Sequence, residues 1–117
     1  MTRKRKKLVY GFGINDADYI TSTKIKGRTV HCKIYSIWSR MLGRCYSPLE
    51  QKKQSSYVGC SVCDDWLVFS NFKRWVDLQE DWKDKELDKD LLCQGNKEYS
   101  PDKCIFVSSF INCILLD

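Results

Sequence analysis

Hydrophobic and polar positions alternate loosely from Ile20 to Cys32, on both sides of the pair Lys26-Gly27. Alternation places successive side chains on opposite faces of a strand, and a central glycine permits a tight turn. This segment therefore predicts a β-hairpin.

The next segment, from Lys33 to Tyr46, has its apolar side chains three or four residues apart, which is typical of an amphipathic helix. Arg40 and Arg44 lie four residues apart on the other face of this predicted helix. These two guanidinium groups could bind phosphates, or they could be ordinary solvated surface. The apolar positions are Ile34, Ile37, Trp38, Met41, Leu42 and Cys45.

The middle of the chain begins with a polar segment, residues 47–57, in which a proline predicts a loop. A tight cysteine turn and an aromatic segment follow, over residues 58–69. Residues 70–79 then predict a short helix that is capped by Ser70. We expect this helix to bury Phe72, Trp75 and Val76 in the core, rather than to present its aromatic rings to nucleic-acid bases.

The last third predicts a strand, a long loop, a second strand and a helix. The strands are expected over residues 86–88 and 104–107, with the loop over 91–103. Ser108 is expected to cap a helix that begins at Ser109 and still continues at Asp117. The apolar end of this helix needs cover, either from this domain or from a partner. Together these elements predict a small α+β protein.

The length of 117 residues leaves room for one domain with a modest core. No apolar run approaches the roughly 18 residues of a membrane span, and the N-terminus lacks the apolar stretch of a secretion signal. We therefore expect an intracellular protein that does not bind a membrane. A small-molecule substrate is not expected either.

The net charge of +5 is distributed unevenly. Residues 8–74 hold ten basic and five acidic side chains, and residues 75–117 hold five basic and ten acidic ones. A basic arm and a basic middle can bind a phosphate backbone, although the arm could also be a solvated tail. The acidic end would repel nucleic acid unless a cation offset its charge. The arm contributes Arg3, Lys4, Arg5, Lys6 and Lys7.

Seven cysteines in a chain without a secretion signal are expected to be metal ligands or buried thiols rather than disulfides. Cys60 and Cys63 form a C-x-x-C turn, which can present two thiolates to a structural Zn²⁺. Cys45 and Cys104 are the candidates for the other two ligands, but both also suit an apolar environment as free thiols. The remaining cysteines are expected to be ordinary thiols: Cys32, Cys93 and Cys113.

Three segments in order suggest a family. They are "YSIWSRMLGRCY", "GCSVCDDWLVFSNFKRWV", and "LDKD" followed by "GNKEYSPDKCIFVSSFIN". From about Tyr35 onward, the chain resembles small phage-encoded HNH endonucleases. The charge distribution gives a basic arm over residues 1–8, followed by one domain over residues 9–117. The resemblance implies that this domain is HNH-like, with a ββα-metal unit at about 86–117. It also implies double-stranded DNA as the partner and the cytoplasm of a host cell as the location.

The resemblance implies one divalent cation, Mg²⁺ or Mn²⁺, with Asp88 and Asn112 as its ligands. The cation would polarise the scissile phosphate while a histidine takes the proton of the attacking water. That histidine is expected directly after Asp88, where this chain has Lys89. Asp90 is a substitute base, and Lys89 could hold a phosphate or neutralise a carboxylate. The only histidine, His31, is expected at the surface or half-buried.

The missing histidine leaves two functions open. One is a DNA-binding protein that nicks DNA with a divalent cation. The other is a catalytically inactive HNH-like protein that binds and inhibits a host nucleic-acid enzyme or defence system.

Overall fold

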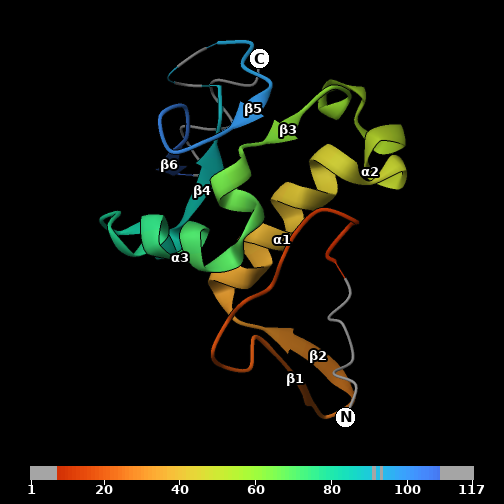
Figure 1. Ribbon diagram of the computed structural model, residues 1–117, viewed down its shortest axis with the longest axis vertical. Helices are drawn as coiled ribbons and strands as arrows, with labels where there is room; N and C mark the ends of the chain where they lie inside the picture. Colours follow the sequence, from red (N-terminus) through yellow and green to blue (C-terminus); the bar gives the residue numbers. More distant parts are fainter. Residues whose placement is uncertain (1–7, 91, 93, 109–117) are drawn as a thin grey trace.

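A computed structural model describes residues 8–90, 92 and 94–108 (Figure 1). Within them, strands form three two-stranded ladders around a set of helices, so the predicted α+β class is confirmed. No helix in this part of the chain is long and apolar enough to cross a membrane. The elements in chain order are β1 (Ser22–Ile25), β2 (Arg28–His31), α1 (Lys33–Tyr46), α2 (Pro48–Lys53), η1 (Ser55–Tyr57), β3 (Ser61–Val62), η2 (Asp64–Leu67), α3 (Phe69–Asp77), η3 (Trp82–Asp84), β4 (Lys85–Asp88), β5 (Glu98–Tyr99) and β6 (Ile105–Ser108), where η marks a 3-10 helix.

The predicted hairpin is present as β1 and β2, paired antiparallel from Ser22 opposite His31 to Ile25 opposite Arg28. The two residues between the strands have positive φ angles, 50° at Lys26 and 78° at Gly27. Two successive left-handed residues give the turn whose twist matches that of the flanking strands. Glycine adopts this conformation at little cost, whereas Lys26 adopts it less readily.

Helix α1 covers the predicted range. It begins after Cys32, whose sulfur accepts a hydrogen bond from the backbone N–H of Tyr35 at 3.3 Å. Its apolar face is buried, and the indole Nε1 of Trp38 donates to the carbonyl oxygen of Trp66 at 2.7 Å. This bond satisfies the polar atom of a fully buried ring.

The prediction of a loop over residues 47–57 was wrong for its first half, which forms α2. Ser47 caps this helix by accepting from the backbone N–H of Glu50 at 3.4 Å, and Pro48 takes its first position. Serine before a helix and proline at its start are ordinary beginning signals. The sequence still predicted a loop despite these signals, because α2 buries no residue and its segment therefore shows no apolar face.

Helix α3 was predicted, but Ser70 is not its cap. The helix begins one residue earlier, and Ser70 donates from its backbone N–H and its hydroxyl to the carboxylate of Asp16, at 2.8 and 2.5 Å. A side chain 54 positions away therefore caps the helix. Phe72 and Val76 are fully buried as expected, while Trp75 is partly buried against the core.

The strands predicted in the last third are confirmed as β4 and β6, which pair antiparallel from Lys85 opposite Ser108 to Asp88 opposite Ile105. The predicted loop between them contains β5, which pairs in parallel with β3 and was not foreseen. The helix predicted from Ser109 onward lies outside the described residues.

The core fills the space between α1, η2 and α3, and its largest residues are fully buried. The aromatic side chains of the middle segment thus build the core, as expected, and they hold α1 in place as one wall of the site below. The fully buried side chains are Trp38, Met41, Leu42, Trp66, Phe69, Phe72 and Val76.

Candidate nucleic-acid interface

A cavity of about 800 Å³ lies between α1 and the segment that runs from β4 to β5. Arg40 and Arg44 line it from α1, and Asp88, Lys89 and Asp90 line it from the end of β4. Two sets of residues that the sequence suggested for separate reasons therefore share one site. We call this cavity the α1–β4 cleft.

The charge of the α1–β4 cleft is mixed but mainly positive. Six basic side chains line it against three acidic ones, Glu86, Asp88 and Asp90. Such a surface attracts an anion, while its carboxylates can attract a cation to the same place. The basic lining residues are Lys33, Arg40, Arg44, Lys85, Lys89 and Lys97.

Asp88 is the last residue of β4 and is half-buried. Its Oδ2 accepts a hydrogen bond from the backbone N–H of Asp90 at 3.0 Å. A carboxylate that accepts from the backbone two residues later fixes a local turn, so the chain leaves the strand in a defined direction. Asp88 thus has a set position at the cleft wall.

Lys89 is buried, and its Nζ lies 3.1 Å from both carboxylate oxygens of Asp90. The same Nζ lies 6.0 Å from the centre of the Tyr99 ring. Of the two roles that the sequence left open for Lys89, this geometry matches the neutralisation of a carboxylate. Because the ion pair occupies both groups, neither is poised to take a proton from water.

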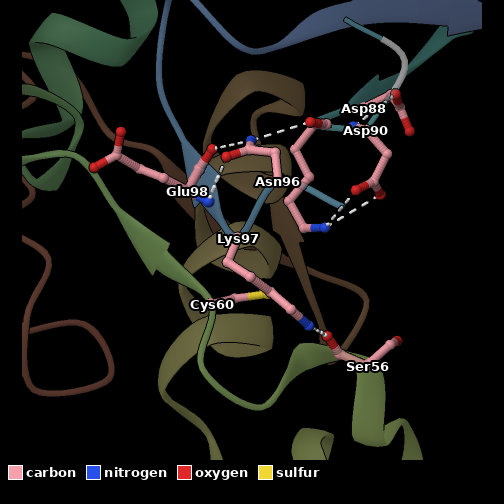
Figure 2. Close-up of polar contacts among 8 residues, drawn as sticks. Ser56, Cys60, Asp88, Asp90, Asn96, Lys97 and Glu98 are labelled. Atoms are coloured by element: carbon pink, nitrogen blue, oxygen red, sulfur yellow. Dashed lines mark hydrogen bonds and ion pairs between the residues drawn. The ribbon is translucent and has the colours of Figure 1, made fainter. Parts of the chain in front are cut away.

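The loop after β4 is fastened by Asn96, which the sequence analysis did not single out (Figure 2). Its amide nitrogen donates to the carbonyl oxygens of Lys89 and Glu98 at 3.0 and 2.5 Å, and its Oδ1 accepts from the Glu98 N–H at 3.0 Å. Lys97 Nζ also donates to the carbonyl oxygen of Ser56 at 2.6 Å. The Gly-Asn pair at 95–96 was a turn signal that could have pointed to this role.

Arg44 is partly buried, with its guanidinium carbon 5.8 Å from the centre of the Tyr57 ring. Burial alone would lower its pKa, but the interaction with Tyr99 outweighs this and raises the pKa of Arg44. Arg44 is therefore a fixed cation in the cleft wall and not ordinary solvated surface. Arg40, one helical turn earlier, is exposed.

His31 is a surface residue, as expected. Its side chain is exposed, and its Nδ1 is hydrogen-bonded to the hydroxyl of Ser22 at 2.5 Å. It also lines the α1–β4 cleft, together with Lys33. The hairpin is thus continuous with the cleft.

The cysteines give the predicted zinc site no support. Among residues 8–90, 92 and 94–108, no three histidine, cysteine, aspartate or glutamate side chains form a group that could hold a metal ion. Burial raises the pKa of Cys45 and of Cys104 to about 12, so both are neutral thiols in the metal-free protein. Cys60 is also buried and Cys63 partly so, which matches the alternative of thiols in an apolar environment.

Several predicted site residues lie outside the described residues. They are the second cation ligand, Asn112, and the basic arm from Arg3 to Lys7, together with Cys93 and Cys113. The DNA-binding role of the arm remains a prediction, and so does the role of Asn112 as a cation ligand.

Comparisons with known proteins found nothing similar to this chain among protein-family models, curated proteins or solved structures. The resemblance to HNH endonucleases therefore depends on the sequence segments alone, and the geometry of the cleft carries the functional argument.

Proposed function

We propose that this protein binds double-stranded DNA in the α1–β4 cleft through the DNA backbone, and that Asp88 holds a Mg²⁺ or Mn²⁺ ion for nicking of the bound strand. One observation carries the proposal: Arg40, Arg44 and Asp88 line the same cavity. Guanidinium groups bind phosphates, and a carboxylate beside a bound phosphate completes the usual surroundings of such a cation.

The described residues offer Asp88 as one hard oxygen ligand, which suits Mg²⁺. Asn112 would be the second ligand by the resemblance to HNH endonucleases. When bound, the ion would polarise the scissile phosphate, lower the pKa of a bound water so that its proton can pass to solvent without a side-chain base, and stabilise the leaving oxygen. Arg40 and Arg44 would hold the neighbouring phosphates and so set the position of the strand.

Binding is tested with a labelled duplex of about 25 base pairs and fluorescence anisotropy over a range of KCl concentrations. Arg40→Ala should weaken binding several-fold and reduce the slope of log affinity against log salt by about one, because one phosphate contact is lost. Lys53→Ala is the matched control, since Lys53 is exposed and lies outside the cleft. The absence of binding, or equal binding by the two variants, would overturn the proposal.

Nicking is tested with supercoiled plasmid and Mg²⁺ or Mn²⁺. Asp88→Asn should abolish nicking but leave DNA binding within a few-fold of the wild type. Asp84→Asn removes an exposed carboxylate outside the cleft and should nick normally. Nicking that survives in Asp88→Asn would place the chemistry elsewhere.

A second function is favoured by the ion pair of Lys89 and Asp90, which occupies the position where the resemblance expects the base. In this alternative, the protein is a catalytically inactive HNH-like protein that binds and inhibits a host nucleic-acid enzyme or defence system. It predicts no nicking under any cation, and a stoichiometric complex with one host protein in place of DNA affinity.

A further inference from the structure

The β1–β2 hairpin is exposed on both faces along its whole length. Its base is fixed by Thr21, which is buried, accepts from the Cys32 N–H at 2.7 Å and receives a bond from Asn15 at 3.1 Å. Two-stranded ribbons that pack against nothing are marginally stable on their own. A ribbon whose hydrogen bonds to the rest of residues 8–90, 92 and 94–108 lie at its base is therefore suited to gain contacts from a partner.

The register divides the hairpin into two different faces. Residues directly opposite each other share a face, so one face carries Ser22, Lys24, Thr29 and His31, all of them polar. The other face carries Thr23, Ile25, Arg28 and Val30. The polar face includes His31, which also lines the α1–β4 cleft, so this face and the cleft form one continuous surface.

Charge identifies the class of partner. Between Asp18 and Glu50 the chain has no acidic residue, while the hairpin carries three cations and α1 with its start three more. A segment that contributes cations and no acids to the surface is complementary to a polyanion, and among the described residues the acids of the continuous surface come only from the β4 side of the cleft, Glu86, Asp88 and Asp90. The six cations are Lys24, Lys26, Arg28, Lys33, Arg40 and Arg44.

We infer that the β1–β2 hairpin enters the major groove of the DNA duplex whose backbone lies in the α1–β4 cleft. This inference rests on the proposed DNA binding. The major groove is about 12 Å wide and admits a two-stranded ribbon without distortion, whereas the minor groove, about 6 Å wide, has to be widened by bending the DNA before a ribbon can enter it. The hydroxyl, imidazole and ammonium groups of the polar face can then bond to base edges, and Lys26 and Arg28 at the tip to phosphates.

The dimensions set the length of DNA that can be covered. The molecule is 53 Å long, and the hairpin lies at one end of this axis with β3 and β5 at the other (Figure 1). At about 3.4 Å per base pair, this length corresponds to about 16 base pairs. A single protein should therefore contact one major groove and the backbone on one side of it.

The test uses a hairpin variant with three substitutions, Lys24→Gln, Lys26→Asn and Arg28→Gln. It removes three charges but retains the fold, because Asn-Gly is the preferred pair in this type of turn. The matched control removes three exposed lysines elsewhere, Lys52→Gln, Lys53→Gln and Lys83→Gln. Both variants are compared with the wild type by anisotropy and by protection of guanine N7, a major-groove atom, from methylation by dimethyl sulfate.

The wild type and the control should protect guanine N7 over a few consecutive base pairs, and the hairpin variant should lose this protection. The hairpin variant should also bind at least tenfold more weakly, with a salt slope smaller by about two to three. If the wild type binds DNA but the hairpin variant has equal affinity and equal protection, only this inference fails. If the wild type does not bind DNA, both this inference and the proposed function fail. Protection confined to minor-groove atoms would also overturn the inference.

Discussion

The β1–β2 hairpin and the β4–β6 pair have the same ladder of four antiparallel residue pairs, but their surroundings are opposite. Every residue of the hairpin strands is exposed. In the other pair, Phe106 is buried with its ring 5.6 Å from that of Trp75 and 6.1 Å from that of Trp82. The same hydrogen-bonding pattern is thus fixed by packing in one place and by a turn and one buried threonine in the other.

This difference corresponds to the roles that we propose for the two regions. The β4–β6 pair positions Asp88 at the wall of the α1–β4 cleft, and a catalytic carboxylate needs a rigid support. The hairpin has no such support, and an element that adapts to a DNA groove can gain its order on binding. Hydrophobic burial, and not the ladder itself, therefore distinguishes the scaffold from the proposed contact element.

The largest expected effect comes from the packing of the β4–β6 pair. Phe106→Ala should lower the free energy of unfolding by about 3 kcal/mol or more, because it leaves a cavity beside two tryptophan rings. Val30→Ala, the corresponding apolar truncation in the hairpin, should change it by less than about 0.5 kcal/mol, since Val30 is half exposed. Urea unfolding followed by tryptophan fluorescence measures both. Equal losses in the two variants would show that the hairpin is packed as firmly as the β4–β6 pair.

A smaller effect is expected from the ion pair at the end of β4. Asp90→Asn leaves the buried ammonium of Lys89 without its counter-ion and should cost about 1–2 kcal/mol, less than for a fully buried pair because Asp90 is half exposed. Lys89→Met removes the charge and keeps the volume, so its effect should be close to zero. The same unfolding experiment compares them. A larger loss for Lys89→Met would mean that Lys89 has a further partner of greater importance than Asp90.

The sequence predicted the elements whose cause is local. The alternation around Lys26-Gly27 predicted the hairpin, and the spacing of apolar residues predicted α1. Both patterns are complete within a short segment, so no distant contact is needed to recognise them. Strand β5 was missed because its two residues are stabilised by β3, far away in the chain. The cap of α3 was assigned to Ser70 for the same reason, since its true partner, Asp16, lies 54 positions earlier.

The sequence predicted which residues belong to the site, but not that these residues lie together. The sequence suggested Arg40, Arg44 and Asp88, but not that they line one cavity. The burial of Arg44 depends on Tyr57 and Tyr99, and no periodicity in α1 announces these contacts. Arg40 and Arg44 are chemically equal, and long-range packing decides that Arg44 is partly buried in the wall of the site while Arg40 is exposed.

The turn of the hairpin offers a test that separates local from global stability. Gly27→Ala should destabilise the hairpin by about 1 kcal/mol, because φ is 78° there and a Cβ is disfavoured in that conformation although no atom lies within 4 Å. Amide hydrogen exchange should become faster in β1 and β2 and stay unchanged in α1 and α3. Lys26→Asn is the opposite control and should slow exchange in the hairpin. Faster exchange throughout the molecule in Gly27→Ala would mean that the hairpin and the core unfold together.

The smallest expected effect concerns Asp16, which ties the segment before the hairpin to α3. Partial burial alone would raise its pKa, but the hydrogen bonds from the Ser70 hydroxyl and backbone N–H outweigh this, so the pKa of Asp16 is lowered. A carboxyl whose pKa is lower in the folded state stabilises the fold above its unfolded pKa of about 4, and this contribution is lost as the pH falls through the folded value.

Asp16→Asn keeps the hydrogen-bond acceptor and removes the charge, so at pH 7 it should cost only a few tenths of a kcal/mol at this exposed position. The difference in unfolding free energy from the wild type should be constant above about pH 5 and should vanish towards pH 2–3. A difference that persists at the lowest pH would assign the effect to the shape of the side chain instead of its charge. The contribution of the contact between Asp16 and Ser70 to stability would then not depend on pH.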